Sequence, residues 1–217
     1  METYLDGSAR IECPPALIPA PGQYLHAHAP ASDLPLPASV FLYDSLPNGF
    51  RAAPPLMPAW TIGTRLNLRG PLGHGFDLPV SARKIALVAL DSSPARLHGV
   101  MSIALEQNLE VVLVGDSTAQ GLPEAVEVQP LQALNEVCKW ADTIVLDASR
   151  ENLNQLKEML GGLERVAAVH DAQILIHTPM PCGALAECGV CAVATQHAWK
   201  LICKDGPVFF LKDVIKL

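Results

Sequence analysis

The arrangement of apolar and polar positions changes near residue 81. Before that point, short apolar alternations are separated by turn residues, and strands are predicted at 24–29, 39–43 and 65–69. Short strands with frequent turn signals are typical of a small β-barrel or sandwich. Only 20 residues precede the turn at Pro21-Gly22, so we expect a truncated barrel.

After residue 81, continuous apolar runs alternate with segments of helical spacing. Strands are predicted at 84–90, 110–115, 143–147, 166–169 and 173–177, and helices at 95–107, 131–140 and 152–160. Continuous apolar runs indicate strands that are covered on both faces. Their alternation with helices is typical of an α/β layer with a parallel sheet.

Four closely spaced cysteines follow near the C-terminus: Cys182, Cys188, Cys191 and Cys203. Soft thiolate ligands select Zn, Cu(I) or iron–sulfur clusters. A C-x2-C pair within four cysteines suits a tetrahedral structural zinc site. The spacing is also close to the plant-type ferredoxin pattern, with a first gap one residue longer. Cys13 and Cys138 stand apart from the array, and we expect them to be inert apolar residues.

Composition and charge exclude several classes of function. The 217 residues carry a formal charge of −7 with only 15 Lys and Arg, which argues against a nucleic-acid partner. No run of eighteen apolar residues predicts a membrane span, and the N-terminus lacks the pattern of a secretory signal. We therefore expect a cytoplasmic protein, in which clustered cysteines bind metal rather than form disulfides.

Several motifs together resemble the electron-transfer subunit of class B dihydroorotate dehydrogenase, within the ferredoxin reductase superfamily. They are Pro21-Gly-Gln-Tyr24, Gly70-Pro-Leu-Gly-His-Gly-Phe76, the cysteine array and Cys203-Lys-Asp-Gly-Pro-Val208. The resemblance implies a reduced flavin-barrel-like domain at 1–80, a nucleotide-binding-like α/β domain at 81–178 and a 2Fe–2S segment at 179–217. It implies that the four cysteines hold the cluster.

The resemblance also implies a role. A chain of this kind relays electrons to or from a catalytic oxidoreductase subunit, such as a dihydroorotate dehydrogenase, within a hetero-oligomer. We therefore expect a non-catalytic electron-transfer subunit. The alternative is a non-redox scaffold whose four cysteines hold a structural zinc ion.

Three segments depart from the family pattern. Leu36-Pro-Ala-Ser39 stands where the family has Arg-Pro-x-Ser, the arginine of which binds flavin phosphates. The segment from Leu90 to Arg96 lacks the glycines that a phosphate cradle needs and carries Asp91 instead. The family's Cys-Gly-Pro turn appears as Asp147-Ala-Ser149. We predict that the chain does not bind NAD.

The same departures weaken the case for FAD. Ser39, Gly70 and Gly73 are the candidate flavin contacts, although the glycine loop at 70–76 is equally well explained as a strand-ending turn. No catalytic residue is predicted, because no partner spacing supports acid–base roles for Asp91, Asp147 or Glu187. His170, His177 and His197 are expected to be ordinary histidines, since a Rieske site would need His in place of two Cys.

Overall fold

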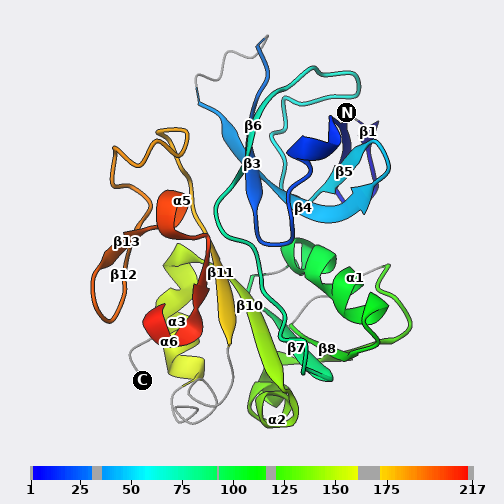
Figure 1. The fold of residues 1–217 in the computed structure, drawn as a ribbon, viewed down its shortest axis with the longest axis vertical. Coiled ribbons are helices and arrows are strands. Elements are labelled where there is room, and N and C mark those ends of the chain that lie inside the picture. Colours follow the sequence, from blue (N-terminus) through cyan, green and yellow to red (C-terminus); the bar gives the residue numbers. More distant parts are fainter. Residues whose placement is uncertain (1, 31–35, 92, 116–120, 161–171, 215–217) are drawn as a thin grey trace.

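The computed structural model describes residues 2–30, 36–91, 93–115, 121–160 and 172–214. The N-terminal part is a six-stranded antiparallel sheet in the order β1-β2-β5-β4-β3-β6 (Figure 1). Its strands are β1 Glu2–Thr3, β2 Ala9–Glu12, β3 Tyr24–His28, β4 Ala38–Leu46, β5 Gly49–Ala52 and β6 Asn67–Leu72. A 3-10 helix, η1 Pro15–Leu17, follows β2.

The three strands predicted in this part are confirmed as β3, β4 and β6, while β1, β2 and β5 were not predicted. These additional strands have only two to four residues, too few for an alternating pattern to stand out. Among the described strands, β1 and β6 lie at opposite edges of the sheet. The antiparallel sheet is therefore confirmed, whereas closure into a barrel is not.

The second sheet has the order β14-β11-β10-β7-β8-β9. Its strands are β7 Lys84–Ala89, β8 Glu110–Val114, β9 Val126–Gln129, β10 Thr143–Ser149, β11 Gln173–His177 and β14 Val208–Phe210. All neighbours are parallel except β14, which runs antiparallel to β11. The predicted parallel α/β layer is confirmed, with β9 and β14 as additions. The strand predicted at 166–169 lies outside the described residues.

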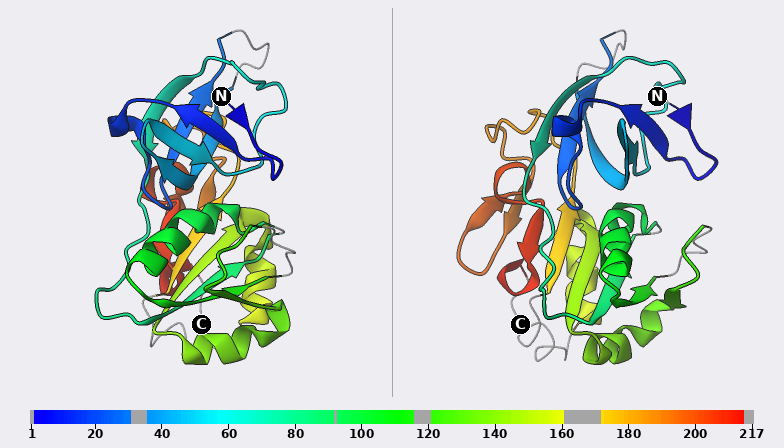
Figure 2. Two further views of the ribbon diagram at one scale, coloured as in Figure 1. Left: turned by 90° about the vertical axis from the view of Figure 1, so that its right-hand side faces the viewer. Right: turned by 45° about the vertical axis from the view of Figure 1, so that its right-hand side comes forward.

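Helices cover both faces of this sheet (Figure 2). They are α1 His98–Glu106 after η2 Ala95–Leu97, α2 Leu134–Trp140 after η3 Leu131–Ala133, and α3 Leu153–Met159 after η4 Arg150–Asn152. Alternate residues of β7 point to opposite faces: Ile85 and Leu87 pack with α1, and Ala86 and Val88 pack with α2 and α3. Burial on both sides explains the continuous apolar runs in the sequence.

The C-terminal segment lies beside β11 and supplies the edge strand β14. It contains the hairpin of β12 Ala192–Ala194 and β13 Trp199–Leu201, and the short helices α5 Ile202–Asp205 and α6 Leu211–Val214 (Figure 1). Buried Cys191, Ile202 and Phe209 belong to the same apolar cluster as Tyr24 and Phe41 of the first sheet. The two sheets and the cysteine segment thus share one core. No helix of the described residues is long and apolar enough to cross a membrane.

Candidate functional site

The motifs that are distant in sequence meet around the fourth cysteine. The Phe76 N–H donates to the Pro21 carbonyl over 2.9 Å, and the His74 N–H donates to the Gly206 carbonyl over 2.8 Å. The Tyr24 hydroxyl donates to the Cys203 carbonyl over 3.1 Å. The turn before β3, the glycine loop after β6 and the segment after Cys203 therefore form one packed unit.

Glycine is required in this unit because the chain segments approach closely. A Cβ atom on Gly73 would lie 2.4 Å from Cδ of Pro207, and one on Gly70 would lie 2.6 Å from Cδ2 of Leu25. Both glycines also have positive φ, +75° and +144°. Packing of the chain on itself thus accounts for Gly70 and Gly73, and their predicted contact with flavin stays a prediction.

The four cysteines form two pairs, with Cys182, Cys188 and Cys191 on the loop before β12 and Cys203 in α5. A hydrogen bond joins the thiols of Cys182 and Cys188, and another joins those of Cys191 and Cys203. Cys191 and Cys203 are buried, Cys182 is half-buried and Cys188 is exposed. No three His, Cys, Asp or Glu side chains among the described residues surround a single point where one metal ion could sit. Cys203 also lies near enough to Cys182 for the charge of Cys182 to raise the pKa of Cys203, so the two pairs adjoin.

The backbone of the loop between Cys182 and Cys191 is turned inward. Four of its residues adopt the left-handed conformation, with φ between +61° and +69°: Gly183, Ala184, Ala186 and Gly189. Left-handed residues are costly where they carry a Cβ atom, so two alanines in this conformation mark a loop shaped by its surroundings. Such turns direct successive backbone N–H groups to the same side, which favours an anionic guest.

Those N–H groups point to sulfur. Slight burial of Cys182 raises its pKa, but hydrogen bonds from Cys188 and from the backbone N–H groups of Leu185, Glu187 and Cys188 outweigh it and lower the pKa to about 6. Burial, reinforced by Cys191, raises the pKa of Cys203 to about 12, against a backbone hydrogen bond from Ala186. The loop therefore offers amide donors to thiolate sulfur, and this donor set fits an anionic iron–sulfur cluster.

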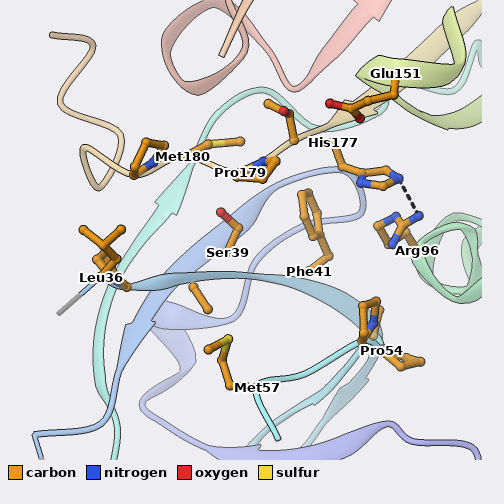
Figure 3. A pocket seen from close by; sticks show the side chains of 16 residues that line it. Leu36, Ser39, Phe41, Pro54, Met57, Arg96, Glu151, His177, Pro179 and Met180 are labelled. Atoms are coloured by element: carbon orange, nitrogen blue, oxygen red, sulfur yellow. Dashed lines mark hydrogen bonds between the residues drawn. The ribbon is translucent and has the colours of Figure 1, made fainter. Parts of the chain in front are cut away.

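A cavity of about 610 Å³ lies between the two sheets (Figure 3). Ser39, Phe41 and Met57 line it from the first sheet and the connections after it, and Arg96 and His177 line it from the second. Ser39 is thus the one predicted flavin contact that reaches this cavity among the described lining residues. A smaller hollow of about 460 Å³, which includes Cys182, shares the rim residues Leu36, Pro37 and Pro181 with it. Together they form a cleft that extends from His177 to the cysteine loop.

A compact group of four charged and titratable side chains closes one end of the cleft. The Arg96 Nε–H donates to both oxygens of Asp147, over 3.0 and 3.1 Å, and Asp147 is fully buried. The Nε2 atom of His177 lies 2.8 Å from Nη2 of Arg96 and 2.6 Å from Oδ2 of Asp91 (Figure 3). The Ser149 N–H also donates to Asp91, over 2.9 Å. We call Asp91, Arg96, Asp147 and His177 the charge cluster.

The charge cluster stands where an open α/β sheet normally binds a ligand. After β7 the chain continues to β8 on one side, and it later returns to form β10 on the other. The carboxyl ends of β7 and β10 flank this switch point, and dinucleotides bind in the crevice there. Burial raises the pKa of Asp91, but hydrogen bonds from His177 and Asn152 and the Arg96 charge bring it below its ordinary value.

The sequence analysis found no partners for Asp91 and Asp147 and treated His177 as an ordinary histidine. In the structure all three contact Arg96, and the prediction that none of them is catalytic stays a prediction. Asp147 and His177 stand 51 and 81 residues from Arg96, which hides these two contacts from any local spacing rule, whereas Asp91 lies only five residues before Arg96. One signal was available, because Asp91, Asp147 and His177 all stand at or just beyond the ends of predicted neighbouring strands.

The fold and the loop define the class, a ferredoxin-reductase-like arrangement with a C-terminal cysteine segment. Residues 177–215 match the iron-sulfur cluster binding domain of dihydroorotate dehydrogenase B. The chain is also 24% identical over 187 residues, 70% of its length, to Sulfhydrogenase 1 subunit gamma of Pyrococcus furiosus, and it spans 64% of that subunit.

Solved structures show the same fold. One, of an NADH-dependent reduced ferredoxin-NADP oxidoreductase, superposes with a TM-score of 0.73 at 16% identity and covers 95% of this chain and 84% of that chain. Another, the ferredoxin reductase of carbazole 1,9a-dioxygenase in its FAD apo form, gives a TM-score of 0.54 at 17% identity and covers 72% and 58%. The predicted resemblance to electron-transfer iron–sulfur subunits of the dihydroorotate dehydrogenase B type is confirmed.

Proposed function

We propose that this chain is an electron-transfer subunit that carries a 2Fe–2S cluster on Cys182, Cys188, Cys191 and Cys203. The observation that carries the proposal is the pairing of the thiols. A 2Fe–2S cluster has two irons, each with two protein ligands, so it needs two pairs of thiolates. The pairs Cys182–Cys188 and Cys191–Cys203 match that requirement.

The alternative, a structural zinc ion, needs four ligands around one tetrahedral centre. The thiols of this chain instead interact in two pairs, and the inward amides donate to the sulfurs of Cys182 and Cys203, one from each pair. These features favour the cluster over the zinc scaffold. A one-electron carrier bound by an exposed loop then needs a redox partner close to the loop.

We infer that the partner is a catalytic oxidoreductase subunit in a hetero-oligomer, for which a dihydroorotate dehydrogenase is one example. The matched Pyrococcus protein is named as one subunit of a sulfhydrogenase. Around the cysteine loop, Leu185, Val190 and Trp199 are exposed, Trp199 to 75%. Large apolar side chains beside an exposed ligand, Cys188, favour a contact surface there. The division into 1–80, 81–178 and 179–217 stays part of this proposal.

Metal and sulfide analysis tests the cluster. Protein purified without oxygen should contain about two irons and two labile sulfides per chain and absorb visible light. Cys188→Ser and Cys191→Ser should lose the absorption and the iron. Cys138→Ser is the matched control, since Cys138 is a buried thiol in α2 that is separate from the loop, and it should retain both. Stoichiometric zinc without sulfide would overturn the proposal.

Crosslinking in the native source tests the partner. The chain should co-purify with an oxidoreductase subunit, and crosslinks should start from Lys200 and Lys204, which are exposed beside β13 and α5. Crosslinks from exposed Lys139 in α2 should be fewer, because α2 packs on β7 and β8, whereas the cysteine segment lies at the β11–β14 edge of the sheet. A monomer whose cysteine face crosslinks to nothing contradicts the subunit role.

A further inference from the structure

Two arginines hold the two ends of the cysteine loop, residues 182–191. Arg69, in β6 of the first sheet, donates to the carbonyl of Gly183, directly after the first cysteine of the loop. Arg150, in η4 beside the second sheet, donates to the carbonyl of Val190, directly before the last cysteine of the loop. The loop is therefore fastened both to the antiparallel sheet and to the α/β layer.

The middle of the loop is open to solvent. Leu185 and the four residues from Glu187 to Val190 are exposed, so burial of apolar surface contributes little to the shape of the loop. Left-handed alanines persist only where the surrounding structure imposes them. The two bonds from arginine supply that constraint, because a hydrogen bond from a charged donor is about twice as strong as one from a neutral donor.

Each of these bonds also fixes the direction of a backbone N–H group. In a trans peptide the carbonyl and the following N–H lie in one plane and point in opposite directions. The bond from Arg69 therefore turns the N–H of Ala184 away from that arginine. The bond from Arg150 does the same for the N–H of Cys191. Holding the carbonyls outward suits a loop whose amides donate to sulfur.

The arginines also bring positive charge to the cysteines. Arg69 and Cys182 line the same hollow, and none of the described residues that line it is acidic. Arg150 has one carboxylate nearby, with Nη2 lying 3.6 Å from Oε1 of Glu151, while its Nη1 is the donor to the loop. Arg69 is exposed and Arg150 is half-buried, so solvent weakens the effect of both charges.

We propose that Arg69 and Arg150 are positioning residues for the cluster, which clamp the cysteine loop at both ends and favour the reduced state through their charge. The effect on reduction rests on the proposed function, whereas the clamp rests on the loop itself. One electron from the partner oxidoreductase subunit adds one negative charge to a 2Fe–2S centre, and net charge is among the factors that set its potential. Two cations beside the loop therefore make the electron easier to accept.

Redox titration of the intact protein, purified without oxygen, tests the effect of the charge. The reduced cluster is followed by electron paramagnetic resonance. At the potential where the wild type is half reduced, Arg69→Gln and Arg150→Gln should each lower the ratio of reduced to oxidised cluster about two- to fivefold, the effect of one partly exposed charge. Arg69→Lys and Arg150→Lys keep the charge and should restore the wild-type ratio. Raising the salt from about 0.1 M to about 1 M should shrink the difference, because salt screens exposed charges.

Iron release and hydrogen exchange test the clamp. With excess chelator, both Gln variants should lose iron about tenfold faster than the wild type, since groups that orient metal ligands have effects of that order on metal binding. In iron-free protein, the backbone amides of residues 183–191 should exchange faster in both Gln variants. Arg65→Gln is the matched control, because Arg65 is exposed just before β6 and does not line the hollow. It should match the wild type in all three measurements.

The outcomes separate this proposal from the function. If the wild type contains iron and sulfide, and both Gln variants match it in potential, iron release and exchange, the proposal is overturned and the function stands. Faster iron release and exchange at an unchanged potential overturn the effect on reduction and support the clamp. If the wild type holds no cluster, the function fails, and equal exchange in all the variants then overturns the clamp as well. The two arginines lie in separate elements, so either variant alone makes the test if the other fails to fold.

Discussion

The two ends of the cleft are built in opposite ways. At the cysteine loop, left-handed residues turn backbone N–H groups toward sulfur, and Cys188 is open to solvent. At the carboxyl ends of the parallel strands, Asp91, Arg96, Asp147 and His177 bind one another, and Asp147 is fully buried. The first end is arranged to hold an external group, and the second is closed on itself. From this difference we predict that the cysteine end binds a group and that the strand end does not.

The largest expected effect comes from breaking the charge cluster. Asp147→Ala leaves Arg96 buried without its carboxylate, which should cost about 3–5 kcal/mol of unfolding free energy. The double variant Asp147→Leu with Arg96→Met should cost clearly less, because neither charge is then stranded. Urea unfolding of the three proteins measures this.

Glu158→Ala provides the comparison for that measurement. Glu158 is an exposed carboxylate in α3, and its loss should change the unfolding free energy by less than about 0.5 kcal/mol. If Asp147→Ala costs no more than Glu158→Ala, the charge cluster is not a closed unit and the comparison between the two ends fails.

The same contrast explains what sequence could predict. The α/β strands were predictable because burial on both faces leaves continuous apolar runs, as in β7 and β10. The two- to four-residue strands β1, β2 and β5 gave no such run. At the site, the cysteine array is local and chemically specific, so its residues could be proposed as ligands directly from the sequence. Arg96 was missed because its partners Asp147 and His177 come from other strands, and only the topology brings them together.

The next effect concerns the glycine loop that joins the motifs around Cys203. In Gly73→Ala the new Cβ atom would lie 2.4 Å from Pro207, on a residue with φ of +75°, so overpacking and backbone strain should together cost about 3 kcal/mol. Gly63→Ala has a similar φ of +84° and no neighbour within 4 Å, so strain alone should cost about 1 kcal/mol. Thermal unfolding compares the two variants. Equal costs would show that the close approach to Pro207 contributes nothing.

A smaller effect comes from the titration of His26, which lies at the cysteine end of the cleft and makes the unfolding free energy depend on pH. Burial, with Arg69 nearby, lowers its folded-state pKa to about 4 from 6.5, so the unfolded chain binds more protons between these values. Stability contributed by the neutral ring is therefore lost as pH falls below 6.5. Between pH 7.5 and 5.0 the loss should be about 2 kcal/mol.

His26→Gln removes that titration. Urea unfolding at the two pH values should show a loss about 2 kcal/mol larger in the wild type than in the variant, since every other titrating group is shared. Parallel losses in the two proteins would mean that the ring is protonated in the folded state, and His26 would then add a charge to the hollow.

The smallest expected effect is no effect at all: the chain should give no saturable micromolar binding of NADH or NADPH in calorimetry. A dinucleotide phosphate at this switch point needs free backbone N–H groups and close approach at glycine. Here the Ser149 N–H already donates to Asp91, and the side chains of Arg96 and Asp147 lie bound to each other at the carboxyl ends of β7 and β10. Two explanations for the absence of binding can be separated. Repulsion by the Asp91 carboxylate would be relieved in Asp91→Asn, whereas occupation of the crevice would not, because the amide side chain has the same shape and Arg96 stays bound to Asp147. We expect Asp91→Asn to bind no nucleotide either. Nucleotide binding by Asp91→Asn but not by the wild type would show that the charge of Asp91 alone prevents binding. Binding by the wild type would show that the charge cluster opens for a nucleotide.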